Sequence, residues 1–430
     1  MIGLRTRTAA LLAALSFGVA PAALGAPVVA PADPVDLGGT PVESPSTDPQ
    51  NRTELTAGLW SDTIPGGVQH EFEYHRTLDN STVHVGVVGT SGADSSDQVA
   101  IEGVVDGQDG EVTCDSNNDS SAYNTPTAPF GTQIFFGPDE PDDLESACLR
   151  SDVVKFSVGR GYSSAQADLP VAIKVVEEAP TDSVDGLPAP PEDPPSFRKP
   201  ADGSPGPVEG ATSFEDAPLL QDGSYEDAAV EGADRVYRVS VGWGQTLSVA
   251  LAAPALTAAQ LEETFGSGPD VQVSLFNPLR NNLADNVDGT EPGGSIGEEP
   301  LRVTNAAGPV RYLDRYDQLP TYLPGDYWVV VSVEPNPETG TDARKDFTID
   351  YTLSVEVQGE EAGAPTYATT DDFTKPFLVG EDAFSTVASG NPAPAAEGEA
   401  ASGTRRFAAL GLGLFGLVCC ELGALQLRRR

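Results

Sequence analysis

This chain of 430 residues contains three histidines, His70, His75 and His84, and histidine is the side chain that most often binds metal ions or transfers protons near neutral pH. His70 and His75 are five positions apart in an alternating apolar pattern, so on a regular strand they point to opposite faces of a sheet. This spacing argues against a metal ion shared by the two. The sequence also contains no GxSxG, HExxH or glycine-rich phosphate-binding motif. These observations favour a protein without catalytic activity.

The segment 115–119, DSNND, has the D-x-N-x-D spacing with which calcium-binding loops begin. It then departs from that pattern. Ser120 stands where the loop needs a glycine for its turn, and Pro126 stands where it needs a glutamate with two ligand oxygens. The segment is therefore not an EF-hand.

The composition limits the possible partners. There are 65 acidic and 24 basic residues, which gives a net charge of −41. A nucleic-acid-binding protein needs a basic surface against the phosphates, so that class is excluded. Lysine is rare, whereas alanine, glycine, proline and aspartate are abundant, which is typical of a high-GC (actinobacterial-type) bacterium or a salt-adapted organism.

The N-terminus has the pattern of a secretory signal peptide over residues 1–26. Arg5 and Arg7 precede an apolar run too short to span a membrane, and small residues follow at the expected cleavage site, after Gly25 or Ala26. An uncleaved N-terminal membrane anchor is the alternative. Either interpretation predicts that the following residues are exported.

The C-terminus predicts one transmembrane helix over residues 407–427. A helix of this length rises about 31 Å, which matches the apolar core of a bilayer. Arginines flank it at 405–406 and 428–430. With an exported N-terminus, the arginine tail is expected in the cytoplasm, in agreement with the positive-inside rule. The sequence thus predicts a single-pass cell-membrane protein.

Export also bears on the cysteines. Cys114 and Cys148 lie in the exported part, whereas Cys419 and Cys420 lie within the predicted span. Two cysteines in an oxidising compartment favour a disulfide, and no further ligands accompany them that would complete a zinc site. Closing a loop of about 35 residues stabilises the fold by roughly 3–4 kcal/mol in the chain-entropy view.

Composition divides the exported part into compact and extended segments. We expect a disordered lead over 27–54, a proline-rich acidic linker over 179–212, and an acidic Ala/Pro/Gly stalk over 359–404. Two compact regions remain, 55–178 and 213–358. Both contain short alternating apolar runs separated by Gly, Pro, Asn and Asp, which predict an all-β protein of two antiparallel sandwiches. The segment 256–266 predicts one short surface helix.

The two regions repeat one motif. Gly58-x-Trp60 opens the first and Gly223-x-Tyr225 opens the second, and a second aromatic residue and an alternating strand follow each. On alternating strands the repeated apolar residues share one face and belong to the core. The residues expected there are Phe72, Tyr74, Tyr237, Val239 and Val241.

The second region resembles the bacterial pre-peptidase C-terminal (PPC) domain, a jelly-roll-like sandwich of secreted proteins. The resemblance rests on Gly223-Ser-Tyr225, "GQTLSVAL" from Gly244, "DVQVSLFNP" from Asp270 and "DYTLSVEV" from Asp350, in the family's order. The first region matches only the opening strands and the closing "VAIKVV". It is either a divergent copy or a different sandwich.

The resemblance also implies where calcium could bind, because members of the family can carry it near strand ends. The candidates in this chain are Asp106, Asp109, Asp115 and Asp119. The alternative is a solvated acidic loop held by Cys114, with no cofactor at all.

Together these features predict a non-catalytic cell-surface protein that displays two sandwich modules for binding. Envelope polysaccharide or another surface protein is the expected partner. The alternative is an accessory subunit of a separately encoded envelope enzyme such as a peptidase, since PPC-like domains usually accompany peptidases.

The topology is testable with reporter fusions. A reporter joined after Arg430 should be active only in the cytoplasm, and one inserted near Gly390 only outside, because the arginine tail is retained inside. The reverse pattern would refute the membrane assignment.

Overall fold

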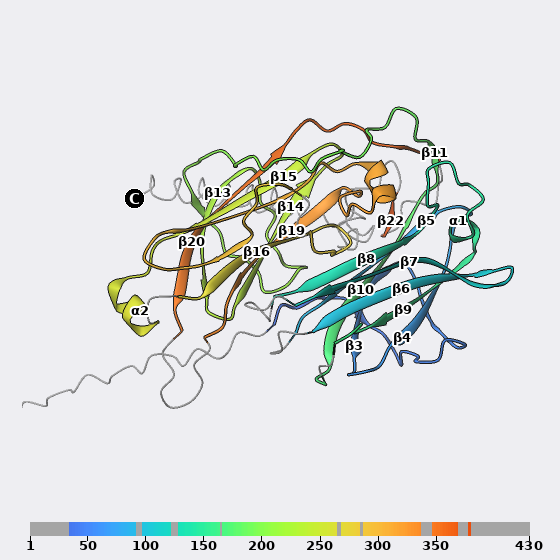
Figure 1. Ribbon diagram of the computed structural model, residues 1–430, viewed down its shortest axis with the longest axis horizontal. Helices are drawn as coiled ribbons and strands as arrows, with labels where there is room; N and C mark the ends of the chain where they lie inside the picture. Colours follow the sequence, from blue (N-terminus) through green and yellow to red (C-terminus); the bar gives the residue numbers. More distant parts are fainter. Residues whose placement is uncertain are drawn as a thin grey trace, which may run out of the picture. The chain divides into compact units, whose positions relative to one another are not determined.

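The computed structural model describes residues 34–91, 97–121, 128–163, 166–264, 268–283, 287–336, 346–368 and 377–379. Within these ranges most regular structure is β-strand, which confirms the all-β fold class (Figure 1). The predicted signal peptide, the predicted span and most of the predicted stalk lie outside them. No helix in the described part of the chain is long and apolar enough to cross a membrane.

Two sheets form the first sandwich. One has the order β3 (Gly58–Ile64), β10 (Leu169–Glu178), β5 (Thr82–Gly89), β8 (Phe130–Phe136). The other has the order β4 (His70–His75), β9 (Val153–Gly159), β6 (Gln98–Gly107), β7 (Gly110–Ser120). The neighbours are antiparallel, and the short strands β1 (Thr40–Pro41) and β2 (Thr53–Leu55) extend the two sheets in parallel.

Two further sheets form the second sandwich. One has the order β13 (Gly223–Val230), β20 (Thr348–Gln358), β15 (Thr246–Ala253), β18 (Leu301–Ala307), with β12 (Gly206–Pro207) parallel to β13. The other has the order β14 (Asp234–Val241), β19 (Gly325–Val333), β16 (Asp270–Phe276), β17 (Gly293–Ser295).

The two sandwiches share one topology. When the eight main strands of each are numbered along the chain, from β3 and from β13, both have a 1-8-3-6 sheet and a 2-7-4-5 sheet. This is the strand order of a jelly roll. The first region, which the sequence left open as a divergent copy or a different sandwich, therefore repeats the topology of the second. The shared turn-and-strand motif occupies equivalent strands in both.

Few other elements are present. α2 (Ala258–Glu263) lies within the predicted helical segment and begins at a capping box between Thr257 and Gln260. The remaining described elements are α1 (Ala147–Arg150), the 3-10 helix η1 (Tyr312–Asp317), β11 (Thr181–Ser183), β21 (Thr366–Tyr367) and β22 (Leu378–Val379).

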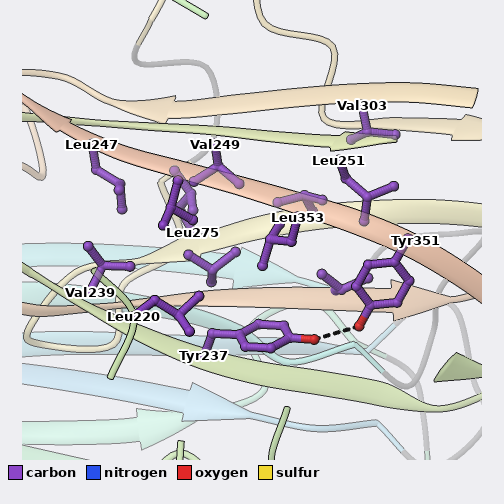
Figure 2. Packing of buried hydrophobic residues seen from close by; sticks show 14 of the residues in the cluster. Leu220, Tyr237, Val239, Leu247, Val249, Leu251, Leu275, Val303, Tyr351 and Leu353 are labelled. Carbon is purple, nitrogen blue, oxygen red and sulfur yellow. Dashed lines mark hydrogen bonds between the residues drawn. The ribbon is translucent and has the colours of Figure 1, made fainter. Parts of the chain in front are cut away.

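Each sandwich has its own core, filled by the alternating residues of its strands. The five core residues expected from the repeat are all buried, which confirms that prediction. Figure 2 shows the second core, where leucines and valines of β15, β16 and β20 pack between the sheets. Tyr237 and Tyr351 join their hydroxyls at 2.6 Å, and Tyr237 also donates to Asp227, so the polar ends of these rings are satisfied inside the core.

The segments expected to be extended or disordered supply several short strands among the residues that the structure describes. From residue 34 onward the lead supplies β1 and β2, and Val35 and Leu37 are buried. The linker supplies β11 and β12. Residues 359–379 supply β21, which pairs with β11, and β22, which pairs with β10. β1, β2 and β12 pair with the outer main strands β3, β4 and β13, whose outward backbone groups would otherwise be free, and composition alone does not reveal this pairing.

An apolar cluster joins the two sandwiches. The outer face of β5 and β10, with Val88 and Val176, packs against the outer face of β14 and β19, with Trp328 and Val330. Within β5, Gly86 leaves room for the loop that follows β16. A Cβ at this glycine would lie 1.9 Å from the carbonyl oxygen of Leu279. The modules are therefore not separated by an extended linker.

A buried ion pair lies beside this cluster. Arg315 of η1 donates to both carboxylate oxygens of Glu178, the last residue of β10, and both side chains are 1% exposed. His84 of β5 and Tyr367 of β21 also bond to Glu178, at 2.8 and 2.7 Å. Burial alone would raise the pKa of Glu178, but Arg315 and His84 hold it well below its usual range. Burial, opposed by Glu178, lowers the pKa of His84.

Removing one partner of this pair tests its importance. Arg315→Met should lower the free energy of unfolding by about 3–5 kcal/mol, because it leaves the Glu178 carboxylate buried without its counter-charge. The double variant Glu178→Gln with Arg315→Met should recover at least half of the loss. Urea unfolding followed by tryptophan fluorescence measures both. A single variant as stable as the wild type would contradict this account.

Candidate functional site

The three histidines have separate partners. His70 Nδ1 lies 2.6 Å from Asp62 Oδ2, His75 is exposed near Glu73, and His84 is buried against Glu178. Among the residues that the structure describes, no group of three or more His, Cys, Asp or Glu side chains is arranged to hold a metal ion.

Cys114 of β7 and Cys148 of α1 form a disulfide, which confirms the predicted pairing. The bond ties the edge strand β7 to the segment that precedes β9.

The DSNND segment bridges the two sheets of the first sandwich. It lies in β7, and its alternate side chains reach the edge strand β8. Asp115 accepts from the backbone N–H of Phe135 at 3.2 Å, and Asp119 accepts from that of Gly131 at 2.8 Å. Between them, Asn117 donates to the carbonyl oxygen of Gln133 at 3.4 Å. Because both strands advance two residues per step in opposite directions, the three bonds form a side-chain ladder between β7 and β8.

This ladder corrects the calcium hypothesis. Asp106 and Asp109 lie at the hairpin between β6 and β7, where Asp106 pairs with Lys155. Asp106 lies opposite Glu111 across the hairpin, and Asp119 is eight residues beyond Glu111 along β7, about 27 Å away at the rise of an extended strand. The four aspartates therefore do not converge. Burial raises the pKa of Asp115 and of Asp119, although the backbone N–H bonds oppose this shift.

A polar groove of about 410 Å³ lies on the outer face of the sheet that contains β9, β6 and β7. Strand alternation turns the apolar residues of β6 into the core and leaves its polar residues outside. Residues lining the groove include Gln98, Glu102, Ser116, Asn118, Ser157 and Tyr162. These side chains offer amide, hydroxyl and carboxylate groups for hydrogen bonds. Gln98 and Asn118 bond to each other at 2.9 Å, so their amides are already oriented.

Tyr162 stands at the rim of this groove and is 99% exposed. Its loop is nevertheless firmly held. The neighbouring Arg160 is buried and donates through Nε and Nη2 to Asp97, at 3.0 and 2.6 Å. The backbone N–H of Tyr162 donates to Gln98 at 2.8 Å. Gly161 adopts a φ of 50°, and a Cβ there would lie 2.0 Å from Gln98 Oε1. The fold thus presents an aromatic ring to solvent on an anchored loop.

A second cavity, the junction cleft, lies where β7 and β8 meet the loop 277–282 and η1. Its volume is about 620 Å³. The lining combines carboxylates, amides and aromatic rings from both sandwiches. Lining residues include Asp115, Asp119, Asp139, Phe135, Tyr316 and Tyr322.

Sequence reasoning missed the groove and the cleft. The outward polar residues of β6 and β7 follow the same alternation that revealed the core, so the alternation could also have indicated this polar face. Tyr162 gave a further signal, an aromatic residue in a Gly-x-Gly-Tyr-like turn with no core position to fill. Arg160, Glu178 and Arg315 gave none, because their partners are 63 and 137 residues distant.

Comparisons with known proteins identify no family. No family model matches the chain, and no curated protein matches it. Structural likeness is slight. The CBM22-1-CBM22-2 tandem domain of Paenibacillus barcinonensis Xyn10C is 9% identical, with 70% of this chain and 92% of that chain covered and a TM-score of 0.17. The ANXUR1 extracellular domain of Arabidopsis thaliana is 11% identical, with 69% and 83% covered and a TM-score of 0.19. Likeness at this level carries no argument about function.

The side-chain ladder predicts distinct effects of two substitutions at one position. Asp119→Ala should lower the free energy of unfolding by about 1–3 kcal/mol, because the buried N–H of Gly131 loses its acceptor. Asp119→Asn keeps an acceptor and should cost less than about 1 kcal/mol. Urea unfolding measures both.

Asp109→Ala, in the hairpin turn, is the control and should be neutral. Millimolar calcium should not shift the midpoint of the wild type. A calcium-dependent shift that Asp119→Asn removes would restore the calcium site and refute the ladder.

Proposed function

We propose that this protein is a non-catalytic binding protein of the cell envelope, and that the groove of its first sandwich binds a polyhydroxylated chain such as an envelope polysaccharide. The observation that carries the proposal is Tyr162. A ring that is 99% exposed contributes nothing to the core, yet a buried Arg160–Asp97 pair anchors its loop beside the groove. Anchored exposed aromatics supply contact area at low entropic cost.

The groove lining suits such a ligand. Sugar hydroxyls both donate and accept, and the groove offers both kinds of partner through Gln98, Asn118, Ser116 and Glu102. The apolar face of a sugar ring can lie on the face of Tyr162. A strongly anionic polymer is disfavoured by the net charge of −41.

The cellular setting of the proposal comes from the sequence and from one bond. The signal-peptide pattern and the predicted C-terminal span support a position of the sandwiches outside the membrane, and the Cys114–Cys148 disulfide fits an oxidising compartment. The resemblance of the second sandwich to PPC domains supports the alternative role, an accessory module beside a separately encoded envelope peptidase. In that role, polysaccharide bound in the groove would keep the peptidase close to the envelope polymer that contains its substrate.

Tyr162→Ala tests the groove. Affinity electrophoresis in gels that contain soluble neutral polysaccharides should show retardation of the wild-type ectodomain. The variant should lose about tenfold or more in affinity, because the ring supplies most of the apolar contact.

Leu144→Ala is the matched control, since Leu144 is an exposed apolar residue (63%) that does not line the groove. It should bind as the wild type does. Equal retardation of the Tyr162 variant and the wild type would refute the proposal.

A further inference from the structure

The groove and the junction cleft meet at β7. Ser116, Asn117 and Asn118 line both cavities, because β7 is the edge strand of its sheet. A ligand that lies along the groove can therefore continue over this edge and reach the cleft without leaving polar side chains. The two cavities together form one track longer than either.

The charges of the cleft differ from those of the groove. Among the residues that line the cleft, all of them described, Arg315 is the one cation, and its charge is matched by Glu178. Three carboxylates remain, Asp115, Asp119 and Asp139. The uncompensated charge of the cleft is therefore negative.

The carboxylates of Asp115 and Asp119 retain acceptor capacity. Each of their oxygens accepts one backbone N–H, from Ser116 and Phe135 at Asp115 and from Ser120 and Gly131 at Asp119. Asp119 also accepts from the side chain of Asn282. A carboxylate oxygen can accept more than one hydrogen bond. Burial raises the pKa of Asp115, and the nearby charge of Asp139 adds to this, so a cation in the cleft would relieve an unfavourable ionised state.

Aromatic rings complete the lining. Phe135, Tyr316 and Tyr322 come from β8, η1 and the segment that follows it. Phe135 and Tyr322 lie edge to face, with ring centroids 6.2 Å apart. Arg315 already lies over the buried Tyr322 ring, 5.1 Å from its centroid, so the half-buried rings of Phe135 and Tyr316 are the ones left for a ligand. Ring faces attract organic cations, and carboxylates beside rings are a combination that recognises an ammonium group carried on an apolar frame.

We propose that the junction cleft is a second subsite for the chain bound in the groove, and that it selects a sugar unit bearing a protonated amino group. The ligand class is then a linear glycan that contains amino sugars with free amines. The inference rests on the proposed function of the groove and adds the identity of the substituent. The net charge of −41 favours approach of such a polymer over an anionic one.

Titration calorimetry with defined oligosaccharides tests the proposal. The probes are the hexasaccharides and disaccharides of glucosamine and of N-acetylglucosamine, in slightly acidic buffer of low ionic strength that keeps the free amines protonated. The glucosamine hexasaccharide should bind the wild type about tenfold or more tighter than its acetylated counterpart. The disaccharides should show a smaller difference, because a short ligand does not reach both cavities.

Variants separate the two cavities. Asp139→Asn, at an exposed cleft residue, should reduce the preference for the free amine by about threefold or more, measured as the ratio of the two hexasaccharide affinities. Asp115→Asn with Asp119→Asn should reduce it further, and a thermal unfolding scan verifies that this double variant is folded. Asp350→Asn, which removes one charge from an exposed position on β20, should leave the preference unchanged.

The outcomes distinguish the two proposals. If Tyr162→Ala weakens both hexasaccharides but neither cleft variant alters the preference, the groove stands and the cleft subsite is refuted. If Tyr162→Ala has no effect on either hexasaccharide, the proposed function fails. Hexalysine that binds as tightly as the glucosamine hexasaccharide, without loss in Tyr162→Ala, would assign the cleft to basic peptides and overturn the proposal.

Discussion

Glu178 is the last residue of β10, the last main strand of the first sandwich, and its carboxylate side chain is 1% exposed. A charge buried this deeply is tolerated only when every oxygen has a partner. Its partners come from β5, η1 and β21, which are separated by long stretches of chain. The need to satisfy one carboxylate therefore fixes how the first sandwich, the second sandwich and the returning segment 366–367 fit together. The apolar cluster around Trp328 buries the surface between the two sandwiches. The Arg315–Glu178 ion pair restricts the two sandwiches to one arrangement.

A second constraint acts at the open side of the first sandwich. β7 and β8 are edge strands of different sheets, and no strand in the described part of the chain pairs with their outward backbone groups. The side chains of Asp115, Asn117 and Asp119 fill that role for β8. β7, which carries these three side chains, also borders the groove and the cleft. The residues that close the sandwich therefore also determine the polar character of its surface. A pattern typical of cation binding thus has a structural use here.

Much of the fold was predictable because it depends on local periodicity. The alternation around Tyr237 and Phe72 indicated strands, their inward faces and the repeat, and the structure confirms all three. The cysteine pairing was predictable from the number of cysteines and from the predicted export. The lead segment was mispredicted because Val35 and Leu37 are too few to suggest a core, and they become buried in the apolar cluster that joins the two sandwiches. Aspartates 106, 109, 115 and 119 were grouped by proximity along the chain, whereas the extended β7 separates them.

The returning segment has a mechanical consequence. β22 lies beside β10, where the backbone N–H groups of Glu177 and Ala179 donate to the carbonyl oxygens of Phe377 and Val379. A pull on the chain beyond Val379 would thus load the first sandwich directly, although the second sandwich is nearer in sequence. The strands run in parallel, so tension along them acts across these hydrogen bonds as shear, which loads them together rather than one after another. Strain would reach β10, and through it Glu178, before the second sandwich bore any force.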